Sequence, residues 1–452
     1  MPVEPRTIVS LSRALRTREL TSEAVTRSCL ERIIERNAGL NAYISVFAHA
    51  AIEQARDADR EITAGRYRGP LHGVPISLKD LLDVRGVATT AASRVREHHV
   101  ASRDAVVVEH LRVGGAVLIG KCNLHEFAFG TTNEDSAFGP ARHPLDPSRS
   151  PGGSSGGSAV SVAAEMAYAS IGTDTGGSVR IPAAMCGLVG LKPAPGEIST
   201  VGVVPLSRTM DHVGPLCRSV DDAALLYEVL RGETPTTLPP ADPVKGLRFG
   251  VLRNYFLALL DAQVAAAFES ACARLQGQGA ALDDATIAHA NDIAPVYLHI
   301  VLAEAGAYHA KTLESRADQY TKNVRLRLEM GRYVLAEDYA RALRGRELLR
   351  QAVDEALESR DALILPTVAV PATKLGAETV RVGSSDEPVR SITLRLTQLF
   401  NLTGHPALTI PCGKTSEGLP IGLQVVGHAH GTRALLSVAR RLEGHLGPGG
   451  SR

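Results

Sequence analysis

Two glycine-dense loops constrain the fold of this chain more than any other feature. The first is Ser150-Pro-Gly-Gly-Ser-Ser-Gly-Gly-Ser158, and the second is Thr173-Asp-Thr-Gly-Gly-Ser-Val-Arg180. Between them lie an alanine-rich segment and the apolar run 167–172, which predict a helix and then a short strand. A helix followed closely by a strand is typical of a β-sheet with helices on its faces. We therefore expect an α/β protein in which these loops leave the sheet.

The rest of the chain repeats this alternation. Residues 7–36 have helical spacing, with Ser22 at an expected N-cap, and 71–84 predict a buried strand that leads into a turn. Asp104 is expected to cap a helix that runs through Leu111. Further segments predict strands at 116–119, 247–252, 362–370, 407–411 and 421–427, helices up to about 350, and a closing helix at 431–443. The pattern indicates one α/β unit that resumes after a helical insertion.

Composition excludes several classes of protein. The 452 residues are 44% hydrophobic and 21% charged, which argues against disorder, collagen-like repeats and a multi-span membrane protein. Forty-nine Lys and Arg balance 48 Asp and Glu, so no overall field favours nucleic acid or anionic lipid. The six cysteines include no C-x-x-C pair, and no apolar leader opens the chain. We expect a cytoplasmic protein with reduced thiols, without a membrane span, a metal or bound nucleic acid.

Two partial motif matches point to other chemistries. Gly115-Ala-Val-Leu-Ile-Gly-Lys121 fits the start of a phosphate-binding loop, but Cys122 stands where Ser or Thr is needed, and the interior resembles a strand. The first glycine loop contains G-x-S-x-G, as in a hydrolase nucleophile elbow, but the polar segment 148–151 precedes it where an apolar strand is required. A flexible Gly/Ser linker is the simpler alternative for this loop.

The second loop fits an oxyanion site. Gly176 and Gly177 leave the backbone bare beside Ser178, and an oxyanion hole needs N–H donors within about 3 Å of the developing charge. The alternative is an ordinary glycine turn capped by Asp174.

Lys79 is the best candidate for a general base. It lies in the apolar window Gly73-Val-Pro-Ile-Ser-Leu-Lys-Asp-Leu-Leu82, although the chain otherwise uses 41 arginines against 8 lysines. Burial lowers the pKa of an ammonium group and can leave a neutral amine near pH 7, whereas a guanidinium stays charged. The alternative is a lysine that extends from a strand end to the surface.

Together these segments resemble the amidase signature family. The motifs that carry the likeness are 73–80, the two glycine loops, Cys186-Gly-Leu-Val-Gly-Leu-Lys-Pro193, Asn123-Leu-His-Glu-Phe-Ala-Phe-Gly130, Met210-Asp-His-Val-Gly-Pro215 and Gly404-His-Pro-Ala-Leu-Thr-Ile-Pro-Cys-Gly413. They cover roughly 60–430, with less support in 240–360. The likeness implies an α/β fold with a mixed central β-sheet, helices on both faces and a helical insertion.

The resemblance assigns roles by position. It implies a Ser–Ser–Lys triad with Ser178 as nucleophile, Ser154 as bridging serine after a cis peptide from Gly153, and Lys79 as base. The other implied roles fall to oxyanion donors Thr175, Gly176 and Gly177, to supporting residues Ser155, Asp174 and Arg180, and to pocket residues Phe129, Gly130 and Thr131. The implied enzyme hydrolyses a small-molecule amide without metal or cofactor, and a homodimer is one option for its assembly.

The resemblance also implies a division of the chain. We expect a single domain over 1–452, made of a helical region 1–60, the signature core 61–230, a Pro-rich connector 231–245 and a part 246–452 that completes the sheet. Substrate specificity is expected in the helical region at about 260–350.

The acyl group of the substrate stays open. The glutaminase subunit of tRNA-dependent amidotransferases carries an aspartate before the segment that matches Gly404, whereas 391–403 here holds no acidic residue, which argues against glutamine. That ammonia-supplying subunit nevertheless remains an alternative, as does a hydrolase of ureido compounds such as allophanate or biuret. Arg395 and the pair Arg325 and Arg327 are the only hints of an acid-bearing substrate.

Overall fold

The structure is a computed structural model that describes residues 6–235 and 242–446. The middle of the expected connector 231–245 and both ends of the expected domain 1–452 lie outside the described residues. Among the described residues, no helix is long and apolar enough to cross a membrane.

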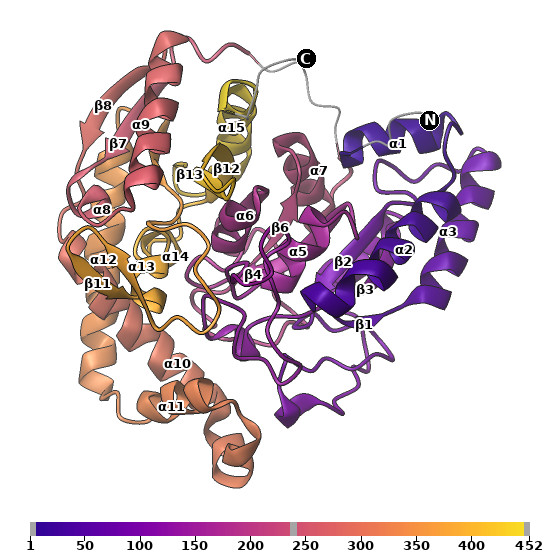
Figure 1. Ribbon diagram of the computed structural model, residues 1–452, viewed down its shortest axis with the longest axis horizontal. Helices are drawn as coiled ribbons and strands as arrows, with labels where there is room; N and C mark the ends of the chain where they lie inside the picture. Colours follow the sequence, from indigo (N-terminus) through magenta and orange to yellow (C-terminus); the bar gives the residue numbers. More distant parts are fainter. Residues whose placement is uncertain (1–5, 236–241, 447–452) are drawn as a thin grey trace.

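A mixed sheet of eleven strands forms the centre of the described molecule, in the order β1-β3-β2-β4-β6-β5-β12-β13-β9-β7-β8. The strands of the first half of the chain therefore form one side of the sheet, and those of the second half form the other (Figure 1). The two halves join where β5 and β12 pair antiparallel. The bounds are β1 Tyr43–Val46, β2 Pro75–Lys79, β3 Val117–Cys122, β4 Ala169–Asp174, β5 Val189–Lys192, β6 His212–Cys217, β7 Arg248–Leu252, β8 Ala281–Ala285, β9 Ala362–Pro366, β12 Ala407–Lys414 and β13 Pro420–Val426, with a separate hairpin of β10 Thr379–Val382 and β11 Ser385–Pro388.

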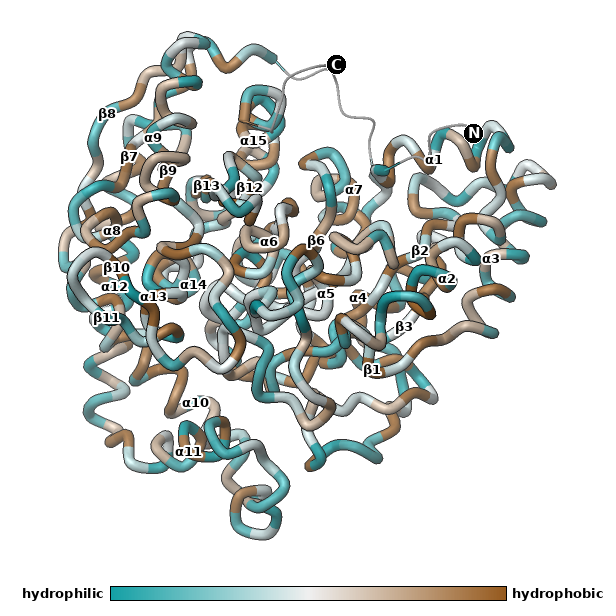
Figure 2. The backbone as a smooth tube through the Cα atoms, in the orientation of Figure 1, coloured by the Kyte–Doolittle hydropathy of each residue, from teal (hydrophilic) through white to brown (hydrophobic). Residues whose placement is uncertain are grey.

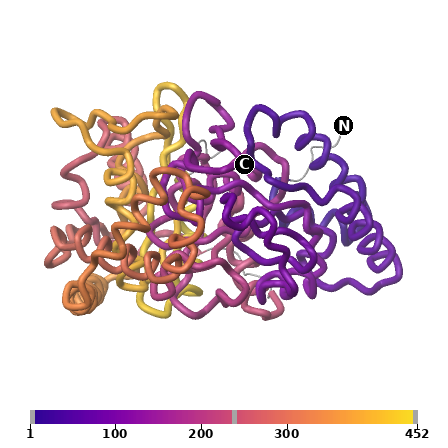
Figure 3. Tube along the Cα trace, turned by 90° about the horizontal axis from the view of Figure 1, so that it is seen from below, coloured from indigo at the N-terminus to yellow at the C-terminus, as the bar shows by residue number. Residues whose placement is uncertain are grey.

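Helices fill most of the connections between these strands. Their bounds are α1 Ile8–Arg16, α2 Ser22–Leu40, α3 Ala48–Thr63, α4 Val106–Val113, α5 Gly156–Ala163, α6 Arg180–Cys186, α7 Val220–Leu230, α8 Asn254–Leu257, α9 Ala262–Gly277, α10 Ile293–Arg316, α11 Lys322–Gly331, α12 Ala336–Leu357, α13 Val389–Leu394, α14 Leu399–Leu402 and α15 Thr432–Leu446. Helices α10, α11 and α12 form the insertion between β8 and β9, at the opposite end of the molecule from the N-terminal helices (Figure 3).

Local details differ from the sequence-based expectations at two helix starts. The N-cap of α2 is Thr21, whose side chain accepts the Ala24 N–H, while the hydroxyl of Ser22 donates to the carbonyl of Gly73. Asp104 does not cap α4, because its carboxylate binds the Arg85 N–H and the Arg112 guanidinium. Two strands also form in regions that were expected to be helical: β1 lies in the expected helical region 1–60, and β8 lies in the stretch of helices expected up to about 350.

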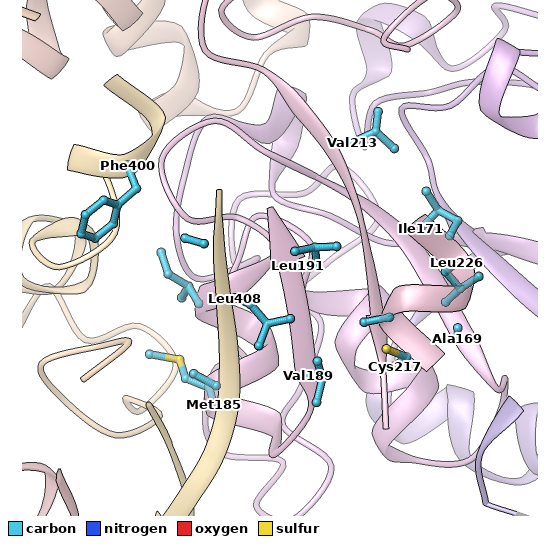
Figure 4. Close-up of a cluster of buried hydrophobic side chains, with 14 of the residues drawn as sticks. Ala169, Ile171, Met185, Val189, Leu191, Val213, Cys217, Leu226, Phe400 and Leu408 are labelled. Carbon is cyan, nitrogen blue, oxygen red and sulfur yellow. The ribbon is translucent and has the colours of Figure 1, made fainter. Parts of the chain in front are cut away.

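The hydrophobic core lies on both faces of the sheet. Every residue of β2, β3, β4, β5, β6, β9 and β13 is buried, which requires cover on both sides. Hydrophobic side chains of β4, β5 and β12 pack with those of α6, α7 and α14 in the cluster shown in Figure 4. The peripheral helices alternate hydrophilic and hydrophobic residues, as one-sided packing requires (Figure 2).

The sheet topology brings the candidate site residues to one edge. Strands β2 and β4 are parallel neighbours, with Leu78 opposite Ile171, so their carboxyl ends lie side by side. Lys79 ends β2, and the second glycine loop begins as β4 ends. The first glycine loop leads into α5, which packs against both strands. In open α/β sheets this edge is the usual place for a ligand.

Candidate active site

Lys79 is completely buried and has only neutral hydrogen-bond partners. Its Nζ donates to Ser154 Oγ at 2.8 Å and to Thr173 Oγ1 at 2.7 Å, and it lies 3.4 Å from the Thr173 carbonyl oxygen. No ion pair to Lys79 is recorded in the described part of the chain. The lysine therefore does not extend to the surface.

The surroundings of Lys79 favour its neutral form. Burial lowers the pKa of Lys79 from 10.5 to about 7, although the charges of Asp174 and Asp211 act in the opposite direction. About half of the molecules would then carry an uncharged amine at pH 7. A neutral amine has two N–H bonds and one lone pair. The two oxygens of Thr173 match the two donors, which leaves the lone pair for the hydroxyl of Ser154.

The first glycine loop places two serines beside the second loop. The peptide bond between Gly153 and Ser154 is cis. Ser154 is completely buried against Lys79, and the N–H of Ser155 donates to the carbonyl of Ser178 at 3.2 Å. The hydroxyl of Ser155 donates to the carbonyl of Thr173 at 3.2 Å. These bonds hold the two loops together, although no hydrogen bond joins the Ser154 and Ser178 hydroxyls among the described contacts.

Ser178 is the member of the set that solvent reaches. It is 5% exposed, whereas Lys79 and Ser154 are 0% exposed. No hydrogen bond from its hydroxyl is recorded within the described residues, so Oγ is available to a substrate. A slightly accessible hydroxyl next to a buried hydroxyl and a buried amine is the order that a proton relay needs.

Part of the second loop presents free backbone donors. The N–H groups of Thr175, Gly176 and Ser178 have no acceptor among the recorded hydrogen bonds of the described chain. We expected the Gly177 N–H to be an oxyanion donor, but it donates to Asp174 Oδ1 at 2.8 Å. A Cβ built on Gly176 would lie 2.4 Å from Tyr297 Oη, so the loop needs glycine there.

Asp174 and Arg180 form a buried ion pair that braces this loop. Arg180 Nη2 lies 2.9 Å from Asp174 Oδ1, and both side chains are 0% exposed. Burial alone would raise the pKa of Asp174, but the charge and hydrogen bonds of Arg180 outweigh it and hold this pKa well below its ordinary value. Side chains from the second half of the chain complete the network: Asn401 and Gln424 accept from Arg180 at 2.6 Å each. The loop is thus fixed from both halves of the sheet.

The expected pocket residues lie against the first glycine loop, the His125 ring and Arg327. A Cβ built on Gly153 would lie 3.0 Å from the carbonyl carbon of Thr131, so this segment contacts the first glycine loop. A Cβ on Gly130 would overlap the His125 ring at 2.1 Å, so glycine is required. Phe129 is buried, and its carbonyl accepts from Arg327 at 2.7 Å.

Sequence reasoning missed three residues that touch the site. Thr173 binds Lys79. The sequence feature that could have identified Thr173 is its position at the end of the predicted strand. Asp211 lies in a motif quoted above without a role; its Oδ1 accepts from the Thr175 hydroxyl at 2.6 Å. Burial raises the pKa of Asp211 to about 6. A cavity of about 110 Å³ opens beside Thr173, Thr175 and Asp211.

The third residue, Tyr297, could not be identified from the sequence, because its contact with Gly176 comes from the distant helix α10.

Comparisons with known proteins agree with this geometry. A family model described as amidase matches residues 24–436. The chain belongs to the amidase family. The chain is therefore an enzyme, a hydrolase that acts on carbon–nitrogen bonds. Among the described residues, no group of three or more His, Cys, Asp or Glu side chains is placed to hold a metal ion.

The relatives include both amidases and amidotransferase subunits. This amidase-family chain is 41% identical over 433 residues to an amidase from Pseudomonas putida, covering 91% of this chain and 90% of the relative. It is 36% identical over 483 residues to a glutamyl-tRNA(Gln) amidotransferase subunit from Koribacter versatilis (strain Ellin345), covering 98% and 99%. A crystal structure of an amidase matches with a TM-score of 0.92 at 38% identity, covering 98% of this chain and 100% of that one.

Proposed function

We propose that this enzyme is a stand-alone amidase that cleaves amides through an acyl-enzyme on Ser178, with Ser154 as bridging serine and Lys79 as general base. The observation that carries the proposal is the 2.8 Å contact between the buried Lys79 Nζ and Ser154 Oγ, with no carboxylate of the described residues bound to the lysine. The proposal treats 1–452 as one domain, because both halves of the sheet hold the loop that carries Ser178.

The reaction follows from the order of the three groups. Ser178 Oγ attacks the amide carbonyl carbon as its proton passes to Ser154 Oγ, while the proton of Ser154 passes to the lone pair of Lys79. The tetrahedral intermediate collapses when the relay returns a proton to the leaving nitrogen, and the C–N bond breaks. Water then attacks the acyl-enzyme through the same relay, and the products are a carboxylate and ammonia or an amine.

The free N–H groups of Thr175, Gly176 and Ser178 would stabilise the oxyanion. Gly177 contributes by a different route, since its bond to Asp174 fixes the direction of its neighbours' amides. Preorganised donors of this kind contribute about 2.7–4 kcal/mol each to lowering the barrier. Asp174, Arg180 and Ser155 are positioning residues in this scheme.

The test is ammonia release by the purified chain from a panel of aliphatic, aryl and ureido amides and glutamine. We expect turnover of at least one simple amide, and loss of that turnover in Ser178→Ala. Ser158→Ala is a matched control, because Ser158 is buried in the same region and its hydroxyl has no partner among the described residues. An active Ser178→Ala variant, or no turnover of any amide, would overturn the proposal.

An ammonia-supplying amidotransferase subunit is the second candidate, because the likeness to the subunit from Koribacter versatilis covers nearly all of both chains. That function predicts glutamine as ammonia donor and little activity of the chain alone. Turnover of simple amides or ureido compounds by the isolated chain, with none of glutamine, would exclude it.

A further inference from the structure

Lys192 is buried as completely as Lys79, and the proposed reaction does not use it. It ends β5 and pairs with Ala407 of β12, where the two halves of the sheet meet. Its Nζ donates to the Pro193 carbonyl at 2.9 Å. Its other recorded polar neighbour in the described chain is His212 Nε2, at 3.5 Å. Lys192 therefore lies against a buried histidine and not against a carboxylate.

His212 connects this lysine to the second glycine loop. It begins β6 and lies opposite Asp174 in the antiparallel pair of β4 and β6. The side chain is buried, and its Nδ1 lies 2.7 Å from the Met210 carbonyl oxygen and 3.3 Å from the Asp174 carbonyl oxygen. Because carbonyl oxygens only accept hydrogen bonds, Nδ1 must carry a proton and donate it to them.

The other ring nitrogen of His212 carries no proton. Burial lowers the pKa of His212 to about 3, and the charge of Lys192 acts in the same direction, so the ring is neutral. A neutral imidazole has one N–H, which the two carbonyls place on Nδ1, and Nε2 then offers its lone pair to Lys192. The lysine has an N–H for it in either charge state. Lys192 thus holds the ring from the edge opposite to the two carbonyls.

The Asp174 carbonyl that His212 contacts belongs to the peptide bond at the start of the oxyanion loop. Asn401 Nδ2 also donates to this carbonyl, at 3.0 Å. The bond from Asp174 to Thr175 is trans, and in a trans peptide the C=O and the N–H point in opposite directions. Donors that hold the carbonyl on one side therefore turn the Thr175 N–H to the other side.

The same segment also holds the side chain of Thr175. The hydroxyl of Thr175 donates to Asp211 Oδ1 at 2.6 Å, and Asp211 lies between Met210 and His212 in the sequence. The Nδ1–H of His212, shared between Met210 and Asp174, ties this segment to the end of β4. Without His212, the hydroxyl of Thr175 stays bound, while the peptide that carries its N–H loses one of two donors.

We propose that His212 is a positioning residue of the oxyanion loop, whose Nδ1–H holds the Asp174 carbonyl so that the Thr175 N–H faces the substrate, and that Lys192 anchors the His212 ring. This inference rests on the proposed amidase function and adds two residues to it. His212 also borders the cavity of about 110 Å³. Measuring kcat and KM separately therefore distinguishes positioning from direct contact with the substrate.

The experiment compares His212→Leu with His212→Asn on an amide that the wild type hydrolyses. Leucine removes the donor, so kcat should fall by about 10- to 100-fold with little change in KM. The amide nitrogen of asparagine is as many bonds from Cα as Nδ1 is, so His212→Asn should recover most of the rate. Lys192→Met should lower kcat in the same direction by less than about 10-fold, and it supplies the test if His212→Leu does not fold.

His72→Leu is the matched control. His72 is also a buried histidine whose Nδ1 has a backbone partner, the Arg68 N–H at 3.2 Å. It lies just before β2, at the opposite end of that strand from Lys79. This variant should lose stability in urea unfolding and keep the wild-type kcat per folded enzyme.

Crystal structures of the wild type and His212→Leu give a readout that does not depend on turnover. We expect the peptide between Asp174 and Thr175 to turn in the variant, and to keep its wild-type direction in His72→Leu. Ordered density for an unturned peptide in His212→Leu would contradict the role of His212.

The outcomes separate this inference from the proposed function. If the wild type hydrolyses an amide and His212→Leu keeps its kcat, or raises KM alone, the positioning role is wrong while the amidase function stands. If no amide reacts but the peptide turns in His212→Leu, the positioning of Thr175 stands and the amidase function fails. If no amide reacts and the peptide does not turn, both fail.

Discussion

Lys79 and Lys121 lie on the neighbouring parallel strands β2 and β3, where Leu78 is opposite Lys121 and Lys79 is opposite Cys122. Both lysines are 0% exposed. Lys121 Nζ lies 2.8 Å from the equally buried carboxylate of Asp80. Within the described part of the chain, Lys79 instead has only the oxygens of Ser154 and Thr173 as hydrogen-bond partners.

The comparison shows that burial alone does not decide what a lysine does. With a carboxylate partner, Lys121 forms a buried ion pair that stabilises the fold. Without one, burial lowers the pKa of Lys79 to about 7, and the side chain becomes able to exchange a proton. Lys121 belongs to the segment that partly matches a phosphate-binding loop. Residues 117–122 of that segment form the buried strand β3.

Of the variants that test this comparison, Lys79→Met is expected to have the largest effect. We expect kcat/KM on an amide substrate to fall by at least about 10⁴-fold, or roughly 5.5 kcal/mol, because the relay loses its base. The free energy of unfolding should fall by no more than about 1 kcal/mol, because the methionine fills a similar space and leaves only the neutral hydroxyls of Ser154 and Thr173 without this partner. Steady-state kinetics and urea unfolding measure the two effects, and near-full activity would show that Lys79 is not the base.

Lys121→Met is expected to do the opposite. It leaves the carboxylate of Asp80 buried, and the N–H and hydroxyl of Thr90 are then its only recorded partners among the described residues. The free energy of unfolding should fall by about 3–5 kcal/mol, since an uncompensated buried charge remains. The double variant Asp80→Asn with Lys121→Met should recover part of this loss. If Lys121→Met unfolds like the wild type, the ion pair is not what stabilises this pair of strands.

Thr173→Val tests whether the neutral hydrogen-bond partner of Lys79 matters for the reaction. Valine keeps the shape but removes the hydroxyl that lies 2.7 Å from Nζ, so the amine loses its orientation toward Ser154. We expect kcat to fall by about 10- to 100-fold with little change in KM. Thr173→Ser, which restores the hydroxyl, should recover most of the rate. Equal losses in both variants would show that the methyl group matters and the hydroxyl does not.

How far the sequence predicted the molecule depended on whether a feature is local. The glycine loops, the strand before Lys79 and the alternation of helices and strands were visible along the chain, so the α/β class was predicted correctly from local patterns. The mixed sheet, also predicted correctly, followed from the family resemblance. Thr21 replaced Ser22 as N-cap because two adjacent hydroxyls satisfy the same pattern, and only the distant Gly73 carbonyl decides between them.

The contacts that the sequence could not show join segments far apart in the chain. Arg390 and Arg395 are five positions apart on one segment, yet their surroundings differ. Nothing in the local pattern indicates that one guanidinium stacks on Tyr255 while the other faces Phe129. Asp211 was within a quoted motif, but the motif did not show its contact with Thr175. The pairing of β4 with β6 brings these two residues together.

Asp211→Asn is expected to have the smallest effect of these variants, because it removes only one of the charges that act on Lys79. The protonated lysine is inactive in the relay, so kcat/KM should rise with pH through the pKa of Lys79, with a midpoint near 7 in the wild type. The pKa of Asp211 is about 6, so its carboxylate is mostly ionised at that midpoint, and its charge favours the protonated lysine.

Asparagine removes this charge, and the acid limb of the pH profile should move to lower pH by less than about one pH unit. Asp222→Asn is the matched control: the pKa of Asp222 is also about 6 because it is buried, but its carboxylate binds the Val9 N–H and does not act on Lys79. A purely structural role of Asp211 would lower kcat/KM at every pH and leave the midpoint unchanged. A midpoint that moves upward would reverse the sign that the geometry requires, since only a group that stabilises the ammonium can delay its loss of a proton.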